Sequence, residues 1–270
     1  MAGFIPERES QWHYRDYVIH SFNADKPYDR FLTEQFAGDE LVDSRGMKTV
    51  TPKTKELLVA TGFLRTANDQ TGNVMTDIPS YRYSVLFDTI EIFGTGVMGL
   101  TLQCARCHSH KYDPVPQRDY YRLMALLTPA YNLQKWIRVG KRKLPAGIDG
   151  LFDVASPPKT HLLVRGDIQT PGSEVRPGYL RAFCDSDSEA LVPRDNFEGK
   201  GATSGRRLAF ARWLTRPANS AVFLCPWWDS PAVEIADVTT TKMPAVCGWL
   251  AAGLNVALSM ERQMTSDTTW

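Results

Sequence analysis

The first half of this chain repeats one pattern, in which apolar residues recur every three or four positions between a proline or capping residue and a glycine. Such spacing places the apolar side chains on one face of an α-helix, and the flanking residues mark where each helix begins and ends. The pattern therefore predicts a mainly α fold. We expect helices over residues 11–22, 25–38, 51–62, 81–103, 116–127 and 204–217.

Several of these expected helices begin or end at residues suited to the position. Asp25, Thr51 and Ser204 can each accept a backbone N–H of the first turn through a side-chain oxygen. Gly38 and Gly62 follow two of the helices and are expected to end them, because glycine readily adopts the conformation found after a helix C-terminus.

The second half of the chain is less regular. Residues 160–167, THLLVRGD, are the best strand candidate, since a short apolar run with a β-branched valine is closed by a glycine. The stretch 168–178 is rich in turn residues. We therefore expect a small mixed α/β part toward the C-terminus, and we interpret RGD at 165–167 as a turn rather than as a cell-adhesion motif.

These changes in character give an expected domain organisation. Residues 1–130 form a helical domain, residues 131–157 a basic, irregular linker, and residues 158–220 the start of a C-terminal domain. Residues 221–270 are an atypical tail for which we expect no defined fold.

Composition narrows the classes of function. Apolar residues make up 43% of the 270 residues and charged residues 23%, a balance typical of a globular protein with a sizeable core. The net charge of +1 argues against a general nucleic-acid-binding protein. The apolar stretch 243–260 contains a proline and an asparagine, so we expect a buried or ill-formed helix there rather than a membrane span.

The segment richest in potential metal and cofactor ligands is residues 104–114, CARCHSHKYDP. Cys104, Cys107 and His108 form a C-x-x-C-H motif, in which two thiols one helical turn apart can add to the two vinyl groups of a porphyrin. The adjacent imidazole then lies under the iron as its proximal ligand. This motif predicts covalently bound haem c.

A zinc site is the alternative for the same segment. Cys104, Cys107, His108 and His110 are four ligands of the kind that zinc prefers, and His108, His110 and Asp113 form an H-x-H-x-x-D set of three. A redox-active cysteine pair and an inert turn with reduced thiols also stay open. No nucleophile elbow, phosphate loop or dinucleotide motif occurs, so no catalytic residue is predicted and it stays open whether the chain is an enzyme.

The second axial position of a haem iron has several candidates. Met98, Met124, His161 and His20 could each supply a ligand, and the site could also be five-coordinate. Met124 lies on the apolar stripe of its expected helix, so we interpret it first as a core residue.

Three long segments resemble one known family. The stretches WHYRDYVIHSFNADKPYDRFLTEQFAGDEL, VMGLTLQCARCHSHKYDPVPQRDYYRLMALL and PPKTHLLVRGDIQTPGSEVRPGYLRAF are similar to the secreted planctomycete-type cytochrome proteins, which carry tandem cytochrome and associated domains of unknown function. RRLAFARWLTRPANS resembles the start of their C-terminal domain, so the resemblance runs from about residue 12 to residue 219. After residue 220 the resemblance ends.

The resemblance implies a periplasmic or secreted protein with haem c on Cys104 and Cys107 and with His108 as the proximal ligand. It also implies electron transfer, or part of an oxidoreductase, with a redox partner protein. His110 and Asp113 match the family's H-K-x-D-P continuation, in which Asp113 would hydrogen-bond an imidazole N–H. We expect the chain to be a fragment of a larger protein of this kind.

Overall fold

The computed structural model describes residues 11–42, 50–67, 79–131, 151, 153, 159–184 and 203–216. Within these residues the chain forms six α-helices and one two-stranded antiparallel sheet, so the predicted mainly α fold is confirmed. The helices are α1 (Gln11–Asn23), α2 (Tyr28–Ala37), α3 (Pro52–Ala60), α4 (Pro79–Gly96), α5 (Gln117–Leu127) and α6 (Arg206–Leu214). Short 3₁₀ helices are η1 (Gly38–Glu40), η2 (Thr61–Arg65), η3 (Leu102–Arg106), η4 (Val164–Gly166) and η5 (Arg181–Phe183).

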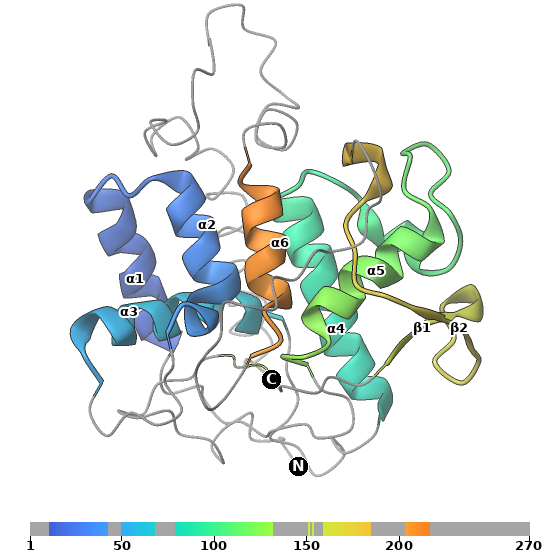
Figure 1. Cartoon of the computed structure of the whole chain (residues 1–270), viewed down its shortest axis with the longest axis horizontal. Helices are drawn as coiled ribbons and strands as arrows, with labels where there is room; N and C mark the ends of the chain where they lie inside the picture. The colour runs from blue at the N-terminus through green and yellow to red at the C-terminus, as the bar shows by residue number, and fades with distance from the viewer. Residues whose placement is uncertain are drawn as a thin grey trace, which may run out of the picture.

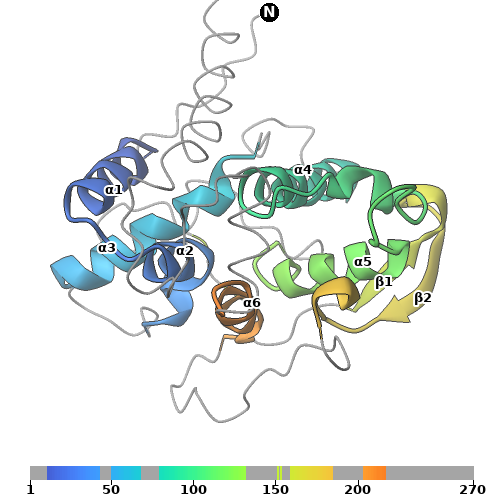
Figure 2. The same cartoon turned by 90° about the horizontal axis from the view of Figure 1, so that it is seen from above.

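Helix α6 lies in the middle of the molecule, between α1, α2 and α3 on one side and α4 and α5 on the other (Figures 1 and 2). Its Phe210 packs edge to face against Phe36 of α2 and Phe93 of α4, with ring centroids 5.3 and 5.5 Å away. All three rings are buried. One apolar core therefore includes helices from both ends of the described chain.

A buried ionic cluster holds α6 against α2 and η1. The guanidinium of Arg207 donates to both carboxylate oxygens of Asp39, at 2.7 and 2.8 Å, and its Nε donates to Asp153 at 2.9 Å. It also donates to the backbone oxygen of Phe36 at 2.9 Å. Glu40 lies beside the same group, with Oε1 3.6 Å from Nη2 of Arg207. Arg207 thus faces three carboxyl groups in the interior.

Burial and the neighbouring charges change the protonation of the acids in this cluster. Burial, and then the charge of Asp153, raise the pKa of Glu40 well above its usual range. Burial alone would raise the pKa of Asp153, but the Arg207 charge beside it holds that pKa below its ordinary value. Glu40 is therefore the carboxyl group that retains a proton most readily.

The small sheet is a hairpin at the end of the molecule beyond α4 and α5 (Figures 1 and 2). Strand β1 (Thr160–Leu163) pairs with β2 (Pro171–Val175) in antiparallel register, with His161 opposite Glu174. The first strand was predicted from its sequence, whereas the stretch containing β2 was predicted as turns only. Pairing with β1 overrides the weak strand propensity of its proline, glycine and serine.

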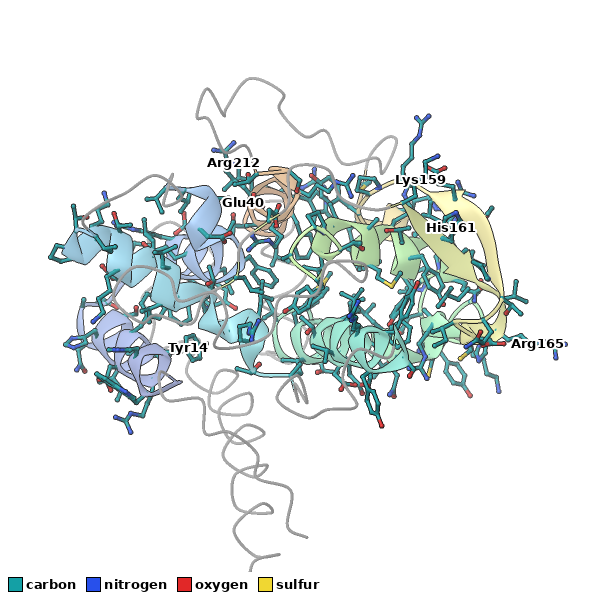
Figure 3. The ribbon with its side chains drawn as sticks, turned by 90° about the horizontal axis from the view of Figure 1, so that it is seen from below. Tyr14, Glu40, Lys159, His161, Arg165 and Arg212 are labelled. Carbon is teal, nitrogen blue, oxygen red and sulfur yellow. The ribbon has the colours of Figure 1, made fainter. Side chains whose placement is uncertain are left out.

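The turn between the strands is tight. Arg165 and Gly166 adopt left-handed conformations, with φ angles of 54° and 75°. The backbone N–H of Asp167 donates to the oxygen of Val164 at 3.1 Å. Figure 3 shows the Arg165 side chain pointing away from the helices at the tip of the hairpin. The interpretation of RGD as a turn is therefore confirmed.

Some predicted helix ends are wrong. The helix expected over 81–103 ends at Gly96, and Gly99, with φ 66°, separates it from η3. Asp25 does not cap α2, because it adopts φ 48° and Pro27 occupies the N-cap position. Gly62 does follow the end of α3 at Ala60, but the chain continues there as η2.

The cap of α6 also differs from the prediction. Left-handed Gly205 is the N-cap. Ser204, one residue earlier, does accept the N–H of Arg206 in the first turn through its hydroxyl, at 3.3 Å, and the same hydroxyl donates to Asp153. The prediction for α3 is confirmed, because the Thr51 hydroxyl accepts the N–H of Thr54 at 3.2 Å and Pro52 begins the helix.

Several predictions concern residues outside the described ranges. These are the linker over 131–157, apart from residues 131, 151 and 153, the tail over 221–270 and the apolar stretch 243–260 within it. The predicted domain boundaries stay predictions. In the part of the chain that the structure describes, no helix is long and apolar enough to cross a membrane.

Candidate functional site

The C-x-x-C-H segment lies in the connection between α4 and α5, at the end of the molecule that carries the hairpin. Leu102 and Ala105 of η3 are buried and attach this connection to the core, whereas Cys104 is exposed and Cys107 partly exposed. Cys104 lies within η3 and Cys107 directly follows it, so the fold leaves one thiol exposed and the other partly exposed.

Arg106, between the two cysteines, fixes this turn to the helices. Its backbone oxygen accepts the hydroxyl of Tyr121 at 2.8 Å and the side-chain amide of Gln117 at 3.0 Å. Its guanidinium lies over the Phe87 ring, 4.8 Å from the centroid. Residues of α4 and α5 thus hold the motif without using the two thiols or the following histidine.

The charge of Arg106 also acts on acidic groups of α4. Burial raises the pKa of Asp88, and the positive charge of Arg106 opposes that rise. Burial likewise raises the pKa of Glu91, with a further contribution from the Asp88 charge. The inner side of the motif is therefore a partly buried electrostatic cluster rather than a plain apolar contact.

His108 has a defined ring orientation. It is exposed, and its Nδ1 lies 2.7 Å from the backbone oxygen of Ser109. A carbonyl oxygen can only accept a hydrogen bond, so Nδ1 carries the proton and Nε2 carries a lone pair. Within the described residues, no side chain or backbone group hydrogen-bonds to this Nε2. The ring is therefore ready to bind a metal through Nε2.

His110 has the opposite tautomer. Its Nδ1 accepts the backbone N–H groups of Asp113, at 2.8 Å, and Tyr112, at 3.3 Å, so the proton is on Nε2. Nε2 then donates to the hydroxyl of Thr101 at 3.2 Å. Both ring nitrogens are engaged, and the side chain is largely buried.

This tautomer rules out two roles in the present arrangement. Thr101, His110 and Asp113 lie in the order of a hydroxyl–imidazole–carboxylate relay, with Asp113 Oδ2 3.4 Å from Nδ1 of His110. A relay needs an unprotonated nitrogen facing the hydroxyl, and here that nitrogen holds the proton. For the same reason Asp113 receives no proton from this ring. The His110 ring instead closes the loop, together with the hydrogen bond that the backbone N–H of His110 donates to the backbone oxygen of Val115.

The zinc ligand sets are not assembled. Among the residues that the structure describes, no three histidine, cysteine, aspartate or glutamate side chains are placed so as to hold a metal ion. A site made of His108, His110 and Asp113 would require the His110 ring to release its present hydrogen bonds. Zinc binding stays a prediction that needs the loop to rearrange.

The hairpin turn contributes to the site from outside the predicted 1–130 domain. A Cβ atom added to Gly166 would lie 2.8 Å from the Cys107 sulfur, so the turn packs directly on that thiol. The amide of Gln117 donates to the backbone oxygen of Leu163 at 3.1 Å as well as to Arg106. Sequence reasoning missed Gln117, Tyr121 and Gly166, because only the folded chain brings them to the motif.

The candidate distal ligands lie in different places. Met98 and Met124 are buried in the core, as the apolar stripe predicted for Met124. His161 lies on β1 (Figure 3), and His20 is exposed on α1, at the opposite end of the molecule (Figures 1 and 2). The candidates therefore stay predictions.

Comparison with known proteins bears on the segment that contains this site. Residues 4–131 match the model of the PSCyt2 family, described as a protein of unknown function (DUF1549). The match confirms the predicted resemblance to planctomycete cytochrome-associated proteins. The C-x-x-C-H motif and both anchoring helices α4 and α5 lie inside the PSCyt2 segment, and the hairpin lies outside it. No curated protein and no solved structure matches the chain.

Proposed function

We propose that this chain is an extracytoplasmic module that binds haem c covalently, for electron transfer or as part of an oxidoreductase. Cys104 and Cys107 would hold the haem through thioether bonds, and His108 would be the proximal ligand of the iron. When bound, haem supplies a one-electron couple whose potential depends on its axial ligands and its surroundings. A redox partner protein would then be required.

The observation that carries this proposal is the tautomer of His108. Histidines that bind metals nearly always donate their other ring N–H to a carbonyl or carboxylate, which fixes the ring and leaves the second nitrogen free to bind. The hydrogen bond from Nδ1 of His108 to Ser109 is of this kind. His110, two residues later, has no free nitrogen. The loop thus distinguishes one ligating histidine from one structural histidine.

The thiols and their support fit the same group. Cys104 and Cys107 are free thiols, and the turn that carries them is anchored by other residues. The extracytoplasmic location rests on the resemblance to secreted proteins of this family and on the PSCyt2 match. A zinc-binding hydrolase is less well supported, because both ring nitrogens of His110, one of its expected ligands, are hydrogen-bonded within the loop. An interaction module is the other alternative.

The proposal is tested by producing the chain with export and c-type haem maturation. We expect an intact mass that exceeds the polypeptide mass by one haem, and an absorption band of haem that remains with the protein after denaturation. The Cys104→Ser/Cys107→Ser variant should lose this mass. A folded wild-type chain without haem would refute the proposal, and stoichiometric zinc in that sample would favour the alternative.

A further inference from the structure

The two thiols of the motif differ in their surroundings. Cys104 is exposed, whereas Cys107 is only partly exposed and lies against the turn of the β1–β2 hairpin. At Gly166 of that turn, an added Cβ would be 2.8 Å from the Cys107 sulfur and 3.5 Å from both Cγ and the backbone oxygen of Arg106. Contacts below 3.0 Å essentially do not occur, so only glycine fits here.

The position of this turn is fixed by hydrogen bonds on both sides. Within the hairpin, the backbone N–H of Val164 donates to the backbone oxygen of Thr170 at 3.0 Å. The backbone N–H of Gln169 donates to the Asp167 carboxylate at 2.9 Å. Toward the helices, the Gln117 amide bridges the backbone oxygens of Leu163 and Arg106. The turn and the C-x-x-C segment are therefore tied to each other through one side chain.

We propose that Gly166 is a positioning residue for Cys107. The turn covers one side of the Cys107 thiol and restricts the direction from which a reactant can approach, so that Cys104 reacts first and Cys107 second. This inference deepens the proposed function and rests on it only for the identity of the natural reactant.

The covalent step itself is an addition. The S–H bond of a cysteine adds across the C=C bond of a vinyl group: sulfur bonds to the carbon next to the porphyrin ring, and the hydrogen goes to the terminal carbon. No electrons are lost and no group leaves, so the step requires only that both thiols are reduced. A thiol that is covered on one side is therefore slower to react than an exposed one, because reactivity follows access to the thiolate.

The inference is tested on the haem-free chain, with both thiols reduced, by mapping the alkylation rate of each cysteine with iodoacetamide and mass spectrometry. We expect Cys104 to react about tenfold faster than Cys107, which corresponds to about 1.4 kcal/mol in activation free energy. The ratio of two rates within one molecule controls for differences in sample quality. Equal rates, or a faster Cys107, would overturn the inference.

Two variants separate the turn from other causes. Gly166→Ala and Gln117→Ala should each raise the rate at Cys107 severalfold and leave Cys104 unchanged, because the first forces the turn away and the second unties it. Gly172→Ala is the matched control, since it alters the same hairpin at a site whose nearest atoms are Leu162 and Val164. If the control raises the Cys107 rate as much as Gly166→Ala does, the assignment of Gly166 is wrong.

The experiment also distinguishes this inference from the proposed function. Unequal alkylation rates in a chain that never acquires haem would uphold the screening of Cys107 and refute haem binding. Equal alkylation rates in the haem-free form of a chain that does acquire haem would refute the screening of Cys107 and uphold haem binding.

Discussion

Replacement of Arg207 by methionine tests how the second half of the chain is held to the first. Arg207 is fully buried and is the cation that faces Asp39, Glu40 and Asp153. Methionine fills a similar volume but removes four hydrogen bonds, those to the two oxygens of Asp39, to Asp153 and to the backbone of Phe36. Asp39, Glu40 and Asp153 then lose the positive charge of Arg207.

The magnitude follows from the cost of an uncompensated buried charge. Removing one partner of a buried ion pair usually costs about 3–5 kcal/mol in free energy of unfolding. We expect a loss of this size at pH 7.5. Burial already raises the pKa of Asp39 in the wild type, and the Arg207 charge holds the pKa of Asp153 below its ordinary value. Without the cation both folded-state pKa values rise, so the folded variant binds more protons than its unfolded state. The loss should therefore shrink as the pH falls, by up to about 1.4 kcal/mol per pH unit for each carboxyl group.

The assay is urea unfolding of the wild type and the variant at pH 7.5 and pH 5.5. Arg212→Met is the matched control, because Arg212 lies on the same helix but is exposed and points away from the fold (Figure 3). If Arg207→Met does not fold at pH 7.5, Arg207→Met/Asp39→Asn removes one of the charges and should recover folding. A loss below about 1 kcal/mol, or one that grows on acidification, would refute the reasoning.

Two further substitutions test the buried carboxyl group of Glu40 and the close packing at Gly38. The folded-state pKa of Glu40 is raised, so its contribution to the free energy of unfolding should fall as the pH rises above about 4.3, the ordinary glutamate value. Glu40→Gln should flatten this pH dependence, which unfolding curves between pH 5 and 8 would measure. A steeper dependence in the variant would contradict the assignment. At Gly38, an added Cβ would lie 2.0 Å from the backbone oxygen of Leu57, so Gly38→Ala should lower the free energy of unfolding by about 2 kcal/mol or more. Gly96→Ala, which meets open space, should have little effect, and equal losses would show that the Gly38 contact is not the cause.

Local features of the fold were predictable from the sequence. The apolar spacing located the α-helices, and the Thr51–Pro52 pair marked the start of α3 correctly. The end of α4 was missed, because the expected helix was continued through Gly96 and Gly99. Gly99 adopts φ 66° after the helix, and Leu102 of η3 packs against Gly94, where a Cβ would be 2.8 Å from its side chain.

Non-local features were not predictable. Strand β2 forms because β1 offers it a partner, and nothing in the residues 171–175 alone favours a strand. The buried cluster around Arg207 was missed for the same reason, since Asp39 and Glu40 follow a helix end and look like exposed acids. Only docking of α6 against this region brings the cation to them.

The C-x-x-C-H motif was visible in the sequence, but the difference between its two histidines was not. His108 and His110 have the same side chain and lie two residues apart. Their roles separate because the backbone turn after His110 directs two N–H groups at its Nδ1, whereas the Ser109 carbonyl faces Nδ1 of His108. Tautomers depend on such geometry, which no spacing rule contains.

The most direct measurement is therefore the absorption spectrum of the reduced haem protein, recorded for the wild type, His108→Ala and His110→Ala after export with c-type maturation. The account predicts that His110→Ala carries covalent haem with the axial-ligand absorption of the wild type. It predicts that His108→Ala has either no haem or haem with a changed spectrum. Loss of the wild-type spectrum in His110→Ala, with the spectrum retained in His108→Ala, would contradict it.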